Sequence, residues 1–368
     1  MSEKKIYKIC IVGSSLAGGG AERAHSNLSK FFHKKGIEIH SIIFEDRVEY
    51  EFWGELFNLG KIKHKTIFEK INRYKKLYDY IKKHRFEYII DLRYRGSLYG
   101  EYILSRIIFS KVKYIPSIRG ANFPVYFTHN SFIGKRLFKN AYKIVTVSKE
   151  MEKQVRKKYG YQNLKTIYNI VETELITQLS QEKISENIDF QHITALGRMH
   201  KHNVKQQDVI IRAYAKSVLP EKGIKLLLVG DGEKRTDFEQ LVNDLHLSDK
   251  VIFTGFKDNP YPYLKNAKFM VLASKTEGFP NVILESFACG TPVVSYDCKT
   301  GPSEMIEHQK NGLLVKDQDI EDLVKSMNMM IENRELYNLC KSNTLKTALE
   351  FSPEIIGQQW LDLMNIKP

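Results

Sequence analysis

The stretch FMVLASKTEGFPNVILESFACGTPVVSYD, residues 269–297, decides the fold. Its first part, FMVLAS (269–274), is typical of a buried strand and leads into a turn at Gly278–Pro280. Pro280 suits the first position of a helix, which is predicted to run from about Asn281 to Ala288. The helix stops before Gly290, since glycine suits the position after a helix end. The last part, TPVVSYD (291–297), returns to a strand. A strand, a helix and a strand in this order predict a parallel α/β sheet.

The same alternation runs through the whole chain. Eight more apolar runs read as buried strands separated by segments of helical length: 7–13, 36–44, 86–92, 112–118, 142–148, 192–197, 224–232 and 251–256. We therefore predict two doubly wound, Rossmann-like domains that face each other across a cleft. Ligands bind at the carboxyl ends of the strands in such sheets.

Polar composition suggests where the domains divide. Residues 173–190 have no strong strand pattern and are predicted to form the linker between domains at 1–172 and 191–350. The amphipathic segment 351–368 begins with a Ser-Pro helix entry and is predicted to pack back toward the first domain.

Composition excludes several classes of protein. The chain has 368 residues, of which 42% are hydrophobic and 27% charged, as in globular proteins with ample core. The four cysteines lack zinc-site spacing and fit a reducing compartment. No apolar run approaches the roughly 18 residues that span a bilayer, and the N-terminus does not resemble a signal peptide. We expect a cytoplasmic protein.

Positive charge is concentrated in the first half of the chain. Residues 1–180 carry 34 Lys and Arg against 17 Asp and Glu, while 181–368 carry 23 against 26. The densest stretch, Lys61–Arg85, has helical spacing of apolar residues with lysines between them. It is either an ordinary surface helix or a helix that faces an anionic membrane or a lipid phosphate. Nucleic acid is the third choice, because no nucleic-acid-binding signature is found.

Two acids bracket the turn in the opening stretch. Glu277 precedes the predicted helix, and Glu285 lies inside it between Leu284 and Phe287, where an idle acid is costly to bury. The backbone N–H groups of Phe279, Asn281 and Val282 are expected to point toward the cleft. Donors flanked by acceptors suit a ligand with an anion and hydroxyl groups. The alternative is a surface helix with Glu277 as a capping acid.

Two further loops have features of anion binding. ALGRMHKHNVKQQD places Arg198, Lys201 and Lys205 just after a strand, although they could be solvated surface charges. VGSSLAGGGAER places Gly18–Gly20 between a strand and a helix. Its spacing matches neither a dinucleotide fingerprint nor a P-loop, so a plain flexible turn is the alternative.

These residues resemble the retaining GT-B glycosyltransferases of family four. The E-x7-E pattern of this family resembles the spacing of Glu277 and Glu285. The resemblance continues through GPSEMI and NGLLV (301–306 and 311–315). GGGAER resembles the loop of members that build bacterial surface glycans on lipid carriers, some of which transfer N-acetylhexosamines to undecaprenyl-diphosphate sugars. The resemblance covers nearly the whole chain and is looser before residue 150.

The resemblance implies roles for the site residues. Glu285 would bind the ribose, Glu277 the donor sugar, and Arg198 and Lys205 the donor diphosphate, so that Glu277, Arg198 and Lys205 form the catalytic set. Further donor contacts would come from Gly19, Gly20, Phe256, Phe279, Asn281 and Val282.

Two departures from the family pattern alter this assignment. The Arg198-to-Lys205 spacing is longer than in the family, so Lys201 could be the phosphate ligand instead. The family's N-terminal histidine also has no clear counterpart. Arg119 and Asn122 occupy that region, and His129 comes later in the chain. Arg119, Asn122 and Arg23 are the residues expected on the acceptor side.

The resemblance implies a hexosyltransferase that retains anomeric configuration. It would use a nucleotide-diphosphate sugar, with UDP favoured, and a lipid-linked or surface-glycan acceptor, without cofactor or metal. Such an enzyme would lie at the inner face of the plasma membrane. The alternatives are a GT-B epimerase or phosphorylase, or a basic lipid or nucleic-acid binder whose sugar site has decayed.

Overall fold

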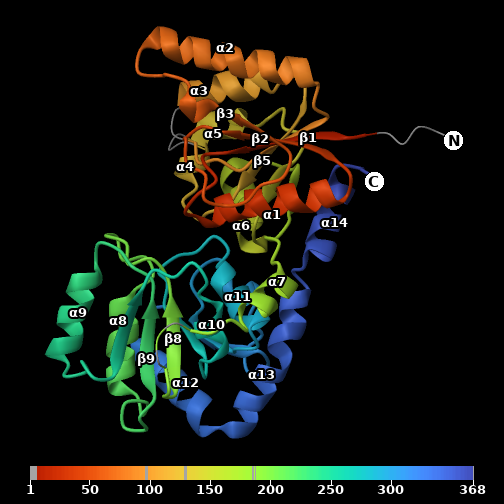
Figure 1. Cartoon of the computed structure of the whole chain (residues 1–368). Helices are drawn as coiled ribbons and strands as arrows, with labels where there is room; N and C mark the ends of the chain where they lie inside the picture. Colours follow the sequence, from red (N-terminus) through yellow and green to blue (C-terminus); the bar gives the residue numbers. More distant parts are fainter. Residues whose placement is uncertain (1–5, 96–97, 128–130, 185, 187, 368) are drawn as a thin grey trace. The chain divides into compact units, whose positions relative to one another are not determined.

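The chain folds into two α/β units, each built on its own parallel sheet (Figure 1). This computed structural model describes residues 6–95, 98–127, 131–184, 186 and 188–367. The first unit comprises Met1–Ile170 and Pro353–Pro368, and the second comprises Val171–Ser352.

The first unit has a seven-stranded sheet in the order β3-β2-β1-β4-β5-β6-β7. The strands are β1 (Lys8–Gly13), β2 (Glu38–Ile43), β3 (Glu55–Asn58), β4 (Tyr88–Asp91), β5 (Lys113–Ile118), β6 (Ile144–Thr146) and β7 (Leu164–Thr166). All neighbouring pairs are parallel. The chain moves outward from β1 to β3 and then returns to β4, so strand order reverses between β1 and β4, as in doubly wound folds.

Helices cover both faces of this sheet, with α1 on one side and α2 and α3 on the other (Figure 1). The segments are α1 (Gly20–Lys34), η1 (Leu59–Lys61), α2 (Ile67–His84), α3 (Leu98–Ile103), η2 (Leu104–Ile108), α4 (Pro124–Phe127), α5 (Ser131–Leu137), α6 (Lys149–Tyr159) and α14 (Pro353–Leu363). The predicted basic helix is α2, which starts with a capping box between Thr66 and Glu69. Its Leu77 and Ile81 are buried, whereas Ile71 is exposed.

The C-terminal helix α14 packs on α1 within the first unit. A side chain on Gly357 would run into the ring of Phe31, so glycine allows this close approach. The buried Trp360 and Leu361 anchor the helix.

The second unit has a six-stranded parallel sheet in the order β10-β9-β8-β11-β12-β13. The strands are β8 (His192–Leu196), β9 (Lys225–Val229), β10 (Val251–Gly255), β11 (Met270–Leu272), β12 (Val293–Tyr296) and β13 (Gly312–Val315). Here the strand order reverses between β8 and β11, which are adjacent and parallel. The stretch 269–297 is therefore β11, a helix and β12, as its pattern predicts.

The helices of the second unit cover its sheet in two groups. Residues of α8, α9 and α12 share one core cluster with the strands, while α10 and α11 pack with α7. The segments are α7 (Thr173–Leu179), α8 (Gln207–Lys216), α9 (Arg235–Asp244), α10 (Tyr261–Lys265), α11 (Asn281–Ala288), η3 (Pro302–Glu304), α12 (Ile320–Glu332) and α13 (Arg334–Leu349).

The predicted fold class, two doubly wound Rossmann-like domains, is confirmed in its architecture. The strand pattern missed β3, β7 and β13, which are the sheet-edge strands of three or four residues. The segment 173–190, predicted as a linker, differs in the structure, because it begins with α7 and belongs to the second unit. Propensity alone missed this helix, which is stabilised by packing on α10 and α11.

Candidate active site

The candidate site lies at the carboxyl edge of the second unit's sheet, where the strand order reverses. Ligands of open α/β sheets bind at such a switch point. The loop after β8 carries Arg198, Lys201 and Lys205, and the loop after β11 carries Glu277 and Phe279. Because β8 and β11 are neighbours, these two loops meet.

An ion pair joins the two loops. The Nζ atom of Lys205 lies 2.6 Å from Oε1 of Glu277, although the residues are 72 positions apart. The backbone N–H of Lys275 also donates to the carbonyl of Val204 at 2.9 Å. Both charged side chains are largely shielded, with 25% and 12% of their surfaces exposed. A lysine ammonium has three N–H donors, so Lys205 can contact Glu277 and an anionic ligand together.

Glycines hold the neighbouring strand ends close together. Gly197 follows β8 at φ 156, and the side chain of Lys205 packs 3.1 Å from where its Cβ would be. Gly230 follows β9 at φ 136, and a Cβ there would clash with the Gly197 carbonyl. Its N–H donates to the carbonyl of Gly255 at 2.9 Å. Bulkier residues would separate these strand ends and displace Lys205.

The turn that carries Glu277 is held by the loop after β12. The hydroxyl of Thr300 donates to the backbone carbonyl of Glu277. Gly301 has φ 103, and any Cβ there would clash with the ring of Pro280. This packing fixes the turn from the side opposite β8.

Helix α11 runs over the predicted residues, Asn281–Ala288, and ends as predicted with Gly290 in the left-handed region at φ 78. Pro280 occupies the position before the helix rather than its first residue. The first turn of α11 contains no acid, so its positive end keeps its full potential. Phe279 is buried, and Asn281 and Val282 are half-buried.

Glu285 does not face bulk solvent. It is 9% exposed and lies between Leu284 and Phe287, which are fully buried. Burial raises the pKa of the nearby Cys289 thiol to about 12, and the negative charge of Glu285 contributes to this shift. The structure thus places Glu285 inside the unit, on the helix that follows the Glu277 turn.

Three of the predicted residues are far more exposed. Arg198 has 72% of its side chain exposed and lies 3.5 Å from Glu233 through Nη2 and Oε1. Lys201 is also exposed. Phe256, just after β10, is 73% exposed. Of the two candidate lysines, only Lys205 makes a direct contact with Glu277.

In the first unit, the glycine loop leads directly into α1. Gly18 has φ 83, Gly19 is the N-cap and Gly20 begins the helix. The Glu22 carboxylate lies over Gly19 and occupies the place of a Cβ there. Burial raises the pKa of this carboxyl. An anion can therefore reach this end of α1 only after the Glu22 side chain moves.

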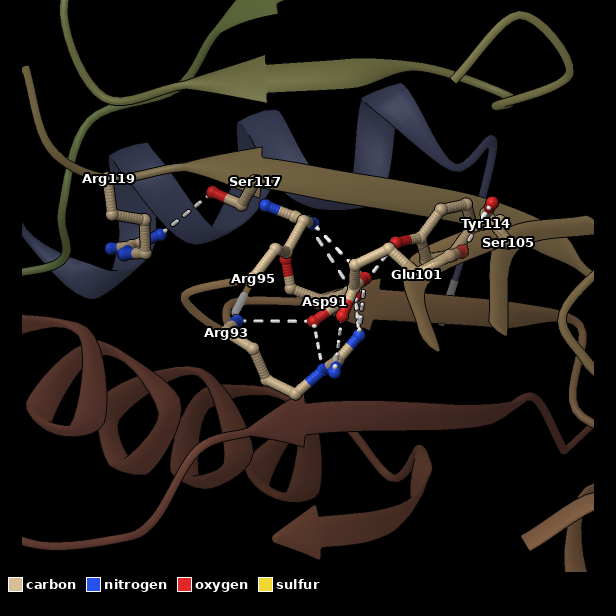
Figure 2. Close-up of polar contacts among 8 residues, drawn as sticks. All are labelled: Asp91, Arg93, Arg95, Glu101, Ser105, Tyr114, Ser117 and Arg119. Atoms are coloured by element: carbon tan, nitrogen blue, oxygen red, sulfur yellow. Dashed lines mark hydrogen bonds and ion pairs between the residues drawn. The ribbon is translucent and has the colours of Figure 1, made fainter. Parts of the chain in front are cut away.

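Arg119 follows β5 and is held by two polar partners. Its Nη1 donates to the hydroxyl of Ser117 at 3.2 Å (Figure 2), and its Nη2 donates to the amide oxygen of Asn169. Burial lowers the pKa of this guanidinium to about 10. Its charge acts on both Glu22 and His25, so these three groups form one electrostatic neighbourhood.

The other residues expected on the acceptor side are less constrained. Asn122 is exposed just before α4. The guanidinium of Arg23 lies 5.3 Å from the centre of the Tyr50 ring. His129 lies outside the described residues.

A buried ionic network at the end of β4 was not predicted (Figure 2). Arg93 donates to both Asp91 oxygens at 2.9 and 2.7 Å and to both Glu101 oxygens at 3.1 and 3.2 Å. The hydroxyl of Tyr114 donates to Asp91 at 2.7 Å. Arg95 is also buried, beside both acids. The network joins β4, β5 and α3.

The charges within this network balance one another. Burial alone would raise the pKa of Asp91, but Arg93 and Arg95, with hydrogen bonds from Arg93 and Tyr114, hold it below its ordinary value. Burial raises the pKa of Glu101. The sequence did carry a signal in DLRYR, residues 91–95, where three charges gather at the end of an apolar strand.

Comparison with known proteins agrees with this architecture. Residues 18–175 match the model described as Glycosyltransferase Family 4, and residues 191–333 match Glycosyl transferases group 1. The first match contains β2 to β7, and the second contains β8 to β13. The chain belongs to this glycosyltransferase family, and its fold is the two-domain GT-B class.

Individual relatives span the chain almost completely. An N-acetylgalactosamine-N,N'-diacetylbacillosaminyl-diphospho-undecaprenol 4-alpha-N-acetylgalactosaminyltransferase from Campylobacter jejuni is 27% identical over 97% of this chain and 99% of its own. A lipopolysaccharide core biosynthesis glycosyltransferase, LpsD, from Rhizobium meliloti is 26% identical over 94% of this chain and 95% of its own.

Solved structures share the fold at lower identity. The Anabaena protein Alr3699/HepE, in complex with UDP, superposes with a TM-score of 0.78 at 19% identity, over 97% of this chain and 99% of its own. A glycosyltransferase from Rickettsia africae gives 0.79 at 17% identity, over 98% of each chain. Within the part of the chain that the structure describes, no helix is both long enough and apolar enough to cross a bilayer.

Proposed function

We propose that the protein is a retaining hexosyltransferase that moves a sugar from a UDP-sugar to a lipid-linked or surface-glycan acceptor. The observation that carries the proposal is the Lys205–Glu277 ion pair at the switch point, on the loop that leads into the helix of the buried Glu285. This arrangement places a cation, hydroxyl acceptors and a helix N-terminus at one edge of the sheet. The UDP complex of Alr3699/HepE supports UDP as the donor nucleotide.

The proposed chemistry depends on stabilising the leaving group. The bond between C1 of the sugar and the β-phosphate oxygen breaks, and negative charge develops on the diphosphate. Lys205 and Arg198 supply positive potential there, an electrostatic contribution that is often the largest in enzyme catalysis. Lys201 is the alternative ligand of the diphosphate. Because Lys201 is exposed, we favour Lys205 for this role.

The acceptor hydroxyl attacks C1 on the face that the diphosphate leaves. Its oxygen forms the new bond to C1, and its proton goes to the departing phosphate oxygen, so configuration is retained. Glu277 accepts hydrogen bonds from the donor sugar and orients it, while Glu285 accepts them from the ribose. Phe279, Asn281 and Val282 add backbone contacts, and Phe256 contacts the base. No metal or cofactor takes part in this scheme.

The roles proposed in the first unit rest on the resemblance. Gly19 and Gly20 would contact the donor phosphates, which requires Glu22 to move. Arg119, Asn122 and Arg23 would bind the acceptor. The names of the Campylobacter and Rhizobium relatives support a polyprenyl-diphosphate-linked or lipopolysaccharide acceptor. Such acceptors are anionic, so we also propose that the enzyme lies at the inner face of the plasma membrane.

A donor screen tests the function directly. The purified chain is mixed with a panel of UDP- and GDP-sugars, and its thermal unfolding is followed. We expect stabilisation by UDP-sugars, with UDP-N-acetylhexosamines as the first candidates, and then transfer of label from the best donor to a polyprenyl-diphosphate sugar. Stabilisation by no nucleotide would contradict the proposal and favour a non-enzymatic basic binder.

A further inference from the structure

A group of metal-binding side chains lies at the β2 edge of the first unit. Glu38 and His40 are on β2, and His84 is the last residue of α2. One ligand atom from each lies within 4.8 Å of the other two. The carboxylate of Glu55 on β3 approaches the same histidine, with Oε2 at 3.4 Å from Nδ1 of His40. Three segments that are distant in the sequence thus bring two imidazoles and two carboxylates together.

The two nitrogens of His40 have different surroundings. Nδ1 lies 2.6 Å from the hydroxyl of Tyr80, as well as near Glu55. Nε2 lies 3.1 Å from Oε1 of Glu38. A metal-binding histidine usually donates its second N–H to an oxygen acceptor, which fixes the ring and leaves the other nitrogen for the metal. Nδ1 donating to Tyr80 or Glu55, with Nε2 turned to Glu38, meets that requirement.

Packing holds this arrangement in place. His40 is fully buried, and its ring centre lies 4.5 Å from that of His84. Tyr80 is stacked on Phe57 with ring centres 4.2 Å apart.

An ion could reach the group from solvent, because His84 and Glu38 are half-buried and Glu55 is exposed. Lys8 is the cation that competes with it. The Nζ atom of Lys8 lies 2.7 Å from Oε1 of Glu38, but a carboxylate has a second oxygen that can bind a metal. Lys83 adds a weaker positive charge near His84.

We infer that Glu38, His40 and His84 form a zinc site, with Glu55 or a water molecule as the fourth ligand. Two imidazoles and a carboxylate are donors that suit Zn²⁺ in tetrahedral geometry. Such a site would join β2, β3 and the C-terminal end of α2. It is separate from the residues proposed for sugar transfer and does not depend on that function.

The test is a zinc titration of the full-length, tag-free chain after dialysis against a chelator. Bound zinc is measured by atomic absorption, and affinity is measured by competition with a chromophoric chelator. We expect one Zn²⁺ per chain and a higher unfolding temperature when zinc is present. H84Q and E38Q change partly accessible side chains and should fold.

The variants separate this site from incidental surface binding. Y80F removes only the hydroxyl beside Nδ1 of His40 and should weaken zinc binding by about 10-fold, while H84Q should weaken it by about 100-fold or more. The control H33Q changes an exposed histidine of α1 and should leave affinity unchanged. H202Q tests the paired surface rings of His200 and His202. No zinc binding by the wild type, or zinc retained by H84Q and lost by H202Q, would overturn the inference.

Discussion

Lys205 and Glu277 form an unusually placed pair of charges. Other lysine–glutamate pairs of similar length, such as Lys216–Glu321, lie at the surface, where ion pairs contribute little to stability. The Lys205–Glu277 pair is instead shielded and lies at the switch point. Charges in such a position interact more strongly with a bound anion than charges in water do.

K205Q tests the proposed role of Lys205 in stabilising the leaving diphosphate. We expect kcat/KM for sugar transfer to fall by about 100-fold or more, as when one preorganised donor is removed from an active site. The measurement is transfer of labelled sugar from the donor found in the screen. K216Q removes the lysine of the exposed Lys216–Glu321 pair in the same unit and should keep full activity. Equal rates for the two variants would contradict the role of Lys205.

The buried His25 leads us to expect that the stability of the fold depends on pH. The ring is fully buried, and burial, with the charge of Arg119, lowers its pKa to about 3 from an ordinary value of 6.5. Between these values the unfolded chain binds more protons than the folded one. Stability is therefore lost as pH falls from about 6.5 toward 3, by at most about 1.4 kcal/mol per pH unit.

The comparison of wild type with H25Q isolates this contribution. The free energy of unfolding in urea is measured for both at pH 7 and at pH 5.5. We expect the stability of the wild type relative to H25Q to decrease by about 1 kcal/mol on acidification. A difference that does not change with pH would show that His25 is not buried and neutral in solution.

At the scale of elements, the network around Arg93 fixes the segment after β4. It connects the strand end at Asp91 with Tyr114 on β5 and Glu101 on α3. A buried pair of this kind is weak support for stability when intact, but removing one partner leaves uncompensated charge. The loop after β4 thus depends chiefly on Arg93, which donates hydrogen bonds to both acids, while Arg95 lies near them at 3.7 and 3.8 Å.

R93M should be strongly destabilising for this reason. Loss of the guanidinium leaves Asp91 and Glu101 buried without it, and we expect a loss of about 3–5 kcal/mol in the free energy of unfolding. R156A is the control in the same unit, because Arg156 pairs with Glu152 on the surface of α6 at 2.8 Å. It should cost only about 0.3–0.5 kcal/mol. Similar urea midpoints for the two variants would contradict the buried network.

The glycine contacts between strand ends give a second prediction at this scale. Gly230 and Gly223 both have positive φ, at 136° and 69°, but only Gly230 faces a backbone carbonyl at the position of a Cβ. G223A should cost about 1–2 kcal/mol from backbone strain alone. G230A adds the clash with Gly197 and should lower the unfolding temperature more. If both variants melt together, the strand ends are not as closely packed as described.

At the scale of the whole molecule, charge is divided between the two halves of the chain. The net charge is +14, and residues 1–180 supply more than all of it. Lysines on α2, including Lys75 and Lys76, are exposed, as are Ile67 and Phe68 at its start. Exposed cations beside apolar groups suit an anionic membrane surface.

Liposome binding tests this proposal. Vesicles that contain anionic lipid should bind the chain at low salt, and binding should decrease steeply as salt screens the charges. The pair K75Q/K76Q should weaken binding by about 1 kcal/mol per lysine, or roughly 30-fold in total. K341Q/K346Q removes two exposed lysines of α13 in the other unit and should have little effect. Binding that ignores salt would count against a peripheral membrane location.

The sequence by itself determined the architecture and the helix of the site. Buried parallel strands are continuous apolar runs, and their alternation with helical segments is readable in any one stretch. The limits of α11 were also local, because Gly290 ends the helix by its own conformational freedom. Only the short edge strands β3, β7 and β13 escaped prediction, because a strand with one neighbour in the sheet need not lie in a long apolar run.

Only the tertiary structure decided which residues meet. Lys205 rather than Lys201 contacts Glu277, since β8 and β11 are neighbours in the sheet while 72 residues separate the two charges in the chain. The same holds for the network around Arg93 and for the imidazole and carboxylate groups of β2, β3 and α2. Periodicity describes a residue's own segment, whereas these contacts depend on strand order, which is set by packing over the whole unit.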